Sequence, residues 1–161
     1  MELEQQLLAA WLRHNGILIL LFDNIPSDGF SAVPLASRGR DVRSQFAHLC
    51  RVRLGWLEYH ATGKRPKLPT SSDKSSQSST KDLRKSLVES GERIEEFLAR
   101  AFRGEQKVRM FGRQPVRWMA YLISHESHHR GQIMLALKQA GKKPPAKIAL
   151  DGLWGRWIYG R

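Results

Sequence analysis

The segment SHESHHRGQI, residues 124–133, places three of the chain's six histidines within five positions. An α-helix turns by about 100° per residue, so His125 and His129 lie one turn apart on the same helical face. The apolar residues Leu122 and Ile133 fall on this face as well. Imidazoles at core positions are costly unless their nitrogens find partners, and one divalent ion can serve two histidines at this spacing. The segment therefore predicts a metal site inside a helical protein.

A divalent ion needs at least a third ligand. His48, at the edge of the apolar face of an earlier amphipathic segment, is our choice for it. His14 lies in the apolar stripe of the first segment and is the reserve ligand, or a group that supports the ligands. A single core histidine is usually a satisfied structural residue, which is the interpretation we prefer for His14 alone. We expect His60, near a helix end, to be exposed.

The same residues spell H-E-x-x-H, the motif in which the glutamate of a zinc peptidase is the general base. The context is wrong for a peptidase, because Asp151 is the only acid after Glu126 and Gln132 stands where the metzincin extension has glycine. Glu126 and His128 fall about 80° to either side of the apolar stripe. We therefore expect Glu126 to lie behind the histidines, where it could orient a proton or a ligand, and His128 either to support them or to lie on the surface.

Four amphipathic segments position these residues, with apolar side chains recurring every three or four positions. They are residues 3–25, 41–61, 80–101 and 115–140. The residues that mark their ends are Pro26, Asp41, Gly63, Thr80, Pro115 and Gly141. No strand pattern or internal repeat is present, so the sequence predicts an all-α fold, a four-helix up-down bundle or a close relative with one long crossover.

The connection between the second and third segments, residues 62–79, has almost no apolar content and predicts a long, solvated and mobile loop. We do not divide the chain there, because neither half offers more than two core helices, and residues 1–161 are expected to form one domain. The aromatic tail after Pro144 is expected to be irregular. Its Trp154, Trp157 and Tyr159 should pack on the bundle or on a second subunit.

Composition fits a soluble globular protein, with 41% apolar and 26% charged residues. The longest apolar run, residues 17–22, is too short to cross a bilayer, and Glu2 and Glu4 stand where a signal peptide is basic. Cys50 is the only cysteine, which excludes an intrachain disulfide, and we expect it to pack as a small helix residue. These features favour a cytoplasmic protein without a membrane partner.

The net charge is +12, from 27 basic and 15 acidic residues, which raises the question of nucleic acid. The basic residues are scattered along the chain, and the aromatic residues lie mostly on apolar faces. No DNA- or RNA-binding signature is recognisable. We therefore favour a solvated basic surface and hold nucleic-acid binding as the less favoured alternative.

The string H-x-x-x-H-R-G-Q-I that starts at His125, followed closely by LALKQAG, resembles the C-terminal signature of the DinB-like family, also called the DinB/YfiT-like metalloenzymes. The resemblance covers most of the chain, including a histidine midway along the second helix and a polar second connection. It implies a four-helix bundle with a divalent ion held by three histidines. At the matching positions of this chain these are His48, His125 and His129.

The resemblance also implies supporting roles for the rest of the motif. Gly131 would allow a close approach between helices, and Arg130 and Gln132 would support the site or an interface. Family members often form dimers, so we expect a homodimer. The family pattern leaves His14, His128 and the basic excess unexplained.

Three neutral imidazoles leave one position of the ion open, where the pKa of water is lowered or a thiolate is held. Relatives with known activities include thiol S-transferases that use low-molecular-weight thiols and a thiol-dependent isomerase. The leading hypothesis is a metal-dependent transferase or hydrolase of small molecules, with zinc or nickel as the expected ion. The alternative is a non-catalytic metal-binding stress protein, which a fourth protein ligand such as His14 would favour.

Overall fold

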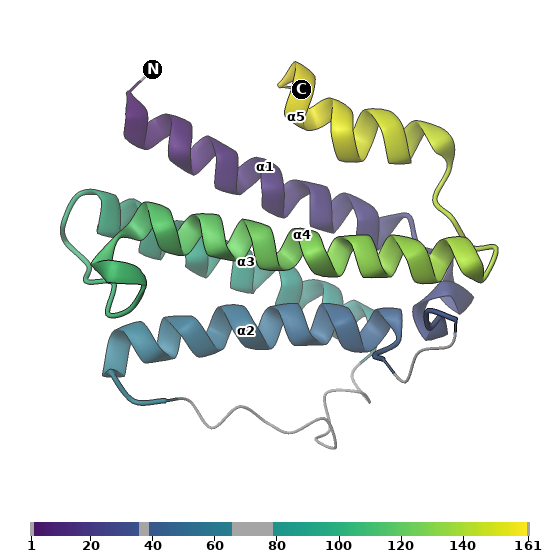
Figure 1. The fold of residues 1–161 in the computed structure, drawn as a ribbon, viewed down its shortest axis with the longest axis horizontal. Helices are drawn as coiled ribbons and strands as arrows, with labels where there is room; N and C mark the ends of the chain where they lie inside the picture. Colours follow the sequence, from purple (N-terminus) through teal and green to yellow (C-terminus); the bar gives the residue numbers. More distant parts are fainter. Residues whose placement is uncertain (1, 36–38, 66–78, 161) are drawn as a thin grey trace.

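Four long helices make up most of the computed structural model, which describes residues 2–35, 39–65 and 79–160 (Figure 1). They are α1 (Leu3–Asp23), α2 (Val42–Thr62), α3 (Thr80–Phe102) and α4 (Pro115–Gln139). The shorter elements are η1 (Ser27–Ser31), η3 (Phe111–Arg113), the π-helical η4 (Ile148–Gly155) and α5 (Arg156–Tyr159). Within these described ranges no residue is in a strand, so the predicted all-α class is confirmed.

Helices α2 and α3 run in the same direction (Figure 1). At their N-terminal ends Arg43 Nη2 donates to Thr80 Oγ1 at 2.8 Å, and towards their C-terminal ends the ring of His60 contacts that of Phe97. Strict up-down alternation is therefore wrong for this pair. The reason is chain length: residues 63–79 can extend over roughly 55 Å, whereas α2 is roughly 31 Å long. The chain can therefore return to the start of α2 before α3 begins.

Local capping chemistry sets the ends of α2, as the sequence predicts. The Asp41 carboxylate accepts the backbone N–H of the residue three positions on, at 2.7 Å, and Gly63 ends the helix in the left-handed region with φ 74°. The cap of α3 differs from the expectation by one residue. It is Ser79 and not Thr80, because Ser79 Oγ accepts the backbone N–H of Asp82 at 3.1 Å.

The buried core consists of two apolar clusters with a polar layer between them along the helix axes. Towards one end lie side chains such as Phe22, Phe46, Leu87 and Ile133, and towards the other Trp11, Leu98, Trp118 and Leu122. The layer between them contains His14, Asn15, Arg53, Ser90 and Glu126, all buried. Buried charges in such a layer must be paired, and this requirement shapes the candidate site.

The C-terminal tail is helical, contrary to the irregular tail that we expected. η4 and α5 lie along α1 (Figure 1), where Arg156 Nη1 donates to the carbonyl of Gly16 at 3.3 Å. A Cβ atom on Gly152 would lie 2.5 Å from Leu20 Cδ2. The absence of a side chain at this position therefore lets the tail approach α1 closely enough to form a packed helix.

The aromatic residues of the tail were expected to pack on the bundle or on a second subunit, and only one of the three packs against the core of its own chain. Trp157 packs against the core, whereas Trp154 and Tyr159 remain 60% and 66% exposed. Most of the predicted polar connection, residues 66–78, lies outside the described residues. In the part of the chain that the structure covers, no helix combines the length and apolar character needed to cross a membrane.

Candidate metal centre

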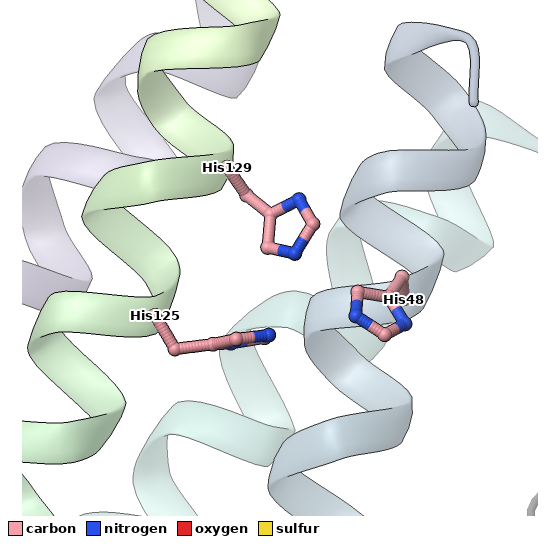
Figure 2. Close-up of side chains that lie close together, drawn as sticks. All are labelled: His48, His125 and His129. Carbon is pink, nitrogen blue, oxygen red and sulfur yellow. The ribbon is translucent and has the colours of Figure 1, made fainter. Parts of the chain in front are cut away.

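Three histidines from two neighbouring helices point towards one another (Figure 2). His48 comes from α2, and His125 and His129 come from consecutive turns of α4. One nitrogen of each ring lies within 4.8 Å of the other two. The ring centroids are 4.7 Å apart for the pair on α4, and 4.8 and 5.5 Å from His48 to His129 and His125. The structure thus brings together the three histidines chosen from the sequence.

The donor set fits a divalent ion that prefers nitrogen. Imidazole nitrogens bound to tetrahedral zinc are roughly 3.4 Å apart, so small rotations of the rings from their present spacing are sufficient. His125 Nδ1 is buried and has no hydrogen-bond partner among the described residues. In the part of the chain that the structure covers, no carboxylate belongs to the cluster, so three neutral imidazoles would leave the fourth position of a tetrahedral ion to a group from outside.

The surroundings keep these imidazoles neutral. Burial lowers the pKa of His48 and of His129 to about 4, and the positive charge of Arg40 contributes to both shifts. Burial also lowers the pKa of His125. Metal ligands must be deprotonated, so histidines that remain neutral well below pH 7 can bind an ion without first releasing a proton.

Gln45, which the sequence analysis did not select, orients one of the three histidines. This buried side chain of α2 accepts a hydrogen bond on Oε1 from His129 Nδ1 at 3.1 Å. With the proton on Nδ1, the lone pair of Nε2 is available to an ion. Gln45 lies one turn before His48, so a polar residue at this buried position was the signal available in the sequence.

Glu126 is fully buried and faces other partners than the expected ion. Arg53 donates from Nε to Oε1 and from Nη2 to Oε2, both at 2.7 Å, and His14 Nε2 donates to Oε2 at 2.8 Å. Burial alone would raise the pKa of Glu126, but the charge and hydrogen bonds of Arg53 and the hydrogen bond from His14 lower it to about 2. Glu126 is therefore an ionised member of the polar layer, and His14 is bonded to it outside the group of three histidines.

Arg53 is the second functional residue that sequence reasoning missed. Its Nη1 also donates to Asn15 Oδ1 at 2.9 Å and to the carbonyl of Leu87 at 3.0 Å, so the guanidinium joins three other helices. A signal was present, because Arg53 is spaced four residues from the apolar Leu49 and Leu57 on the core stripe of α2. A charged residue at a core position predicts a charged partner on a facing helix.

The family follows from a comparison of the whole sequence. The model of the DinB family matches residues 1–157. The chain belongs to the DinB family. A search of the curated proteins finds no match. The family match includes both helices that carry the three histidines, so the resemblance noted for the fourth-helix motif is confirmed over nearly the full length of the chain.

The rest of the DinB motif lies on the outer side of α4. His128 is exposed and accepts a hydrogen bond from the Gln132 amide at 3.0 Å, and the Arg130 guanidinium lies 5.8 Å from the centre of the Trp154 ring. Gly131 is exposed, and a Cβ atom added there would meet nothing within 4 Å. The expected close helix approach at Gly131 is therefore wrong, whereas Arg130 connects α4 to the C-terminal tail.

Two expectations about burial are also corrected in this DinB family chain. His60 is 1% exposed, because the segment before α4 crosses the end of α2 and the backbone N–H of Arg109 donates to His60 Nδ1 at 3.2 Å. His125 is half-buried and lies at the edge of the core stripe, whose centre passes through Glu126 and His129. The α4 stripe is thus rotated from the position expected from its apolar residues alone.

Proposed function

We propose that this DinB family protein holds one divalent ion through His48, His125 and His129 and catalyses a metal-dependent transfer or hydrolysis of a small molecule. The observation that supports this most directly is the meeting of three neutral imidazole nitrogens from α2 and α4 within 4.8 Å. Zinc and nickel both suit such a set of ligands. A fourth protein ligand is absent from the cluster found among the described residues.

The chemistry follows from the open position. A divalent ion held by these three histidines would lower the pKa of a bound water to about 7 and would hold a bound thiol as its thiolate. In thiol transfer, the sulfur of a low-molecular-weight thiol attacks an electrophilic carbon. A sulfur–carbon bond forms, the leaving group departs with its bonding electrons, and the thiol proton passes to solvent. The protein's own contribution is to keep the imidazoles neutral and, through Gln45, to hold the His129 ring in one orientation.

Elemental analysis of purified protein tests the ligand set. We expect about one divalent ion per chain in the wild type and a loss of most of it in His125→Ala and His129→Ala. His128→Ala is the matched control, because this exposed histidine precedes His129 on α4 but does not belong to the cluster. A wild type that holds no metal and takes none up would overturn the proposal, as would an equal loss in His128→Ala.

Activity is tested separately on the metal-loaded protein, by following thiol consumption with a panel of electrophilic small molecules. Turnover that disappears on chelation and returns with metal supports the transferase, and metal-dependent cleavage without thiol supports the hydrolase. A protein that holds its ion at the three histidines and turns over nothing would favour the non-catalytic metal-binding alternative.

We also infer that the protein forms a homodimer through its tail. Leu150, Trp154 and Ile158 follow one another at intervals of four residues and are 65%, 60% and 68% exposed. A row of large apolar side chains that the chain's own core does not use is typical of a subunit interface. Light scattering should give the mass of two chains for the wild type and of one chain for Ile158→Glu. A monomeric wild type would contradict the inference.

A further inference from the structure

A pocket of about 590 Å³ lies next to the three histidines, within the size range of small-molecule sites. Its lining residues are Val52, Gly55, Trp56, Tyr59, Arg65, Met110 and Tyr121. Val52 follows His48 by one turn of α2, and Tyr121 precedes His125 by one turn of α4. The rings of Tyr121 and His125 are stacked, with centroids 5.8 Å apart and planes at 19°. One end of the pocket is therefore adjacent to the candidate metal centre.

Aromatic side chains form the walls of this pocket. The ring of Trp56 meets that of Tyr121 at 5.9 Å and that of Phe111 at 4.8 Å, both edge-to-face. Phe111 has a left-handed backbone with φ 56°, a conformation that is costly for a residue with a side chain and that places its ring against Trp56 and Tyr121. Flat aromatic surfaces held in this way suit a planar, apolar ligand.

The far end of the pocket carries a cation. Among the described residues that line the pocket, Arg65 is the only charged one, and no acidic side chain in the same part of the chain lies within ion-pair distance of it. Its guanidinium is therefore available for a carboxylate, which it can bind through two parallel hydrogen bonds. From Val52 to Tyr59 the pocket follows α2 for roughly 10 Å, a length that a fused aromatic ring system can fill.

Positive charge around the end of the pocket next to the three histidines also favours the binding of an anion. The positive charge of Arg40 acts on both His48 and His129. No acidic residue is among the pocket-lining residues of ranges 2–35, 39–65 and 79–160, and the chain as a whole carries a net charge of +12. A basic surface around a site raises the local concentration of anionic ligands and their rate of association.

We propose that this pocket binds the electrophilic substrate, and that the substrate is an aromatic carboxylate. Its carboxylate lies on Arg65, its ring system packs against the side chains of Trp56 and Tyr121 that line the pocket, and its reactive carbon points towards His48 and His125. The proposal rests on the proposed function, because it assigns the second reactant of the same centre. It also defines a binding preference that can be measured without turnover.

The preference for a carboxylate is tested with 2-naphthoate and its neutral counterpart 2-naphthamide, by calorimetry on chelator-treated and zinc-loaded protein. We expect the naphthoate to bind about 10-fold more tightly, and Arg65→Gln to remove this difference. Lys64→Gln, which removes the same charge one residue away and outside the lining, should retain it. Equal affinities for the two probes in the wild type would overturn the proposal, as would the same loss in both variants.

The shape of the site is tested with Val52→Trp, which places a large side chain in the pocket. Both probes should then bind at least about 10-fold more weakly, while elemental analysis still finds the wild-type metal content. Unchanged affinities would show that the probes bind elsewhere and would also overturn the proposal.

The metal site at the three histidines and the binding of an aromatic carboxylate in the pocket can be refuted independently of each other. If the metal assignment is wrong, His129→Ala and chelated wild type should still prefer naphthoate over naphthamide through Arg65. If the pocket assignment is wrong, Arg65→Gln and wild type will bind both probes alike, while the metal content of the wild type remains about one ion per chain.

Discussion

At the scale of single residues, one turn of α4 serves two different environments. His125 and His129 project towards His48, whereas Glu126 between them projects into the polar layer and accepts three hydrogen bonds from Arg53 and His14. The carboxylate therefore fixes the rotation of α4 about its own axis. Because Glu126 lies between His125 and His129 on α4, the direction of both histidines depends on this buried ion pair.

Removal of the Glu126 carboxylate should lower the stability of the protein. In Glu126→Ala the guanidinium of Arg53 stays buried without its charged partner, and we expect the free energy of unfolding to fall by about 3–5 kcal/mol. Urea denaturation measures this. Glu58→Ala, at an exposed position of α2, should stay within about 0.5 kcal/mol of the wild type. Equal stabilities for the two variants would contradict a structural role for the pair.

Gln45 should affect the metal more than the fold. Gln45→Leu removes the acceptor for His129 Nδ1, so the ring loses its fixed tautomer, and we expect metal affinity to fall about 10- to 100-fold. Competition with a chromophoric chelator measures the affinity. The control is Gln5→Leu, the same substitution at an exposed position of α1, which should retain wild-type affinity. An unchanged affinity in Gln45→Leu would exclude the orienting role.

At the scale of secondary-structure elements, the helices could be predicted because their signals are local. Apolar periodicity defines α1 to α4, and residues such as Asp41 and Gly63 mark the ends of α2. The direction of α3 could not be predicted, since it depends on where a long polar connection leads the chain. The helical tail was missed for a similar reason, because its order comes from contacts with α1 and not from its own sequence.

The candidate site likewise has residues that could be predicted from the sequence and residues that could not. The spacing of His125 and His129 shows that they share one helical face, and the position of His48 on a second helix made it the third candidate. Arg53 was missed, and Glu126 was expected beside the core stripe instead of within it, because charged residues were assigned to outer faces, although both occupy core positions. Which charged residue is buried depends on a partner from another helix, and such a pairing is not visible in either helix alone.

Burial of His60 near the C-terminal end of α2 predicts that the stability of the protein depends on pH. Burial and then the charge of Arg109 lower the pKa of His60 to about 4, whereas an unfolded histidine has a pKa of about 6.5. Between these values the unfolded chain binds more protons, so the stability falls as the pH is lowered from about 6.5 to 4. In chelated protein, urea unfolding should show this slope in the wild type and in His128→Gln, and a shallower one in His60→Gln. Three equal slopes would contradict the assignment.

At the scale of the whole molecule, the packing predicts a fold that does not need a bound ion. The three histidines join only α2 and α4, and apolar clusters lie on both sides of the polar layer. Structural zinc sites, in contrast, use four protein ligands and supply much of the folding energy.

Removal of the metal should therefore leave the protein folded. We expect chelation to leave the helical circular-dichroism signal at 25 °C unchanged and the unfolding transition cooperative, while added metal raises the melting temperature through binding to the native state alone. Collapse of the helical signal on chelation would show that the ion is structural and would favour the non-catalytic alternative.

The buried ion pair has a consequence for how an ion is taken up. A slip of α4 by one turn, about 5.4 Å, would carry Glu126 away from Arg53 and leave both charges among apolar side chains. Axial sliding is thus opposed electrostatically, and we expect the ion pair to hold His125 and His129 opposite His48 before an ion arrives. Loading then requires only ring rotations, so uptake should be limited by the arrival of the ion and not by a rearrangement of the backbone.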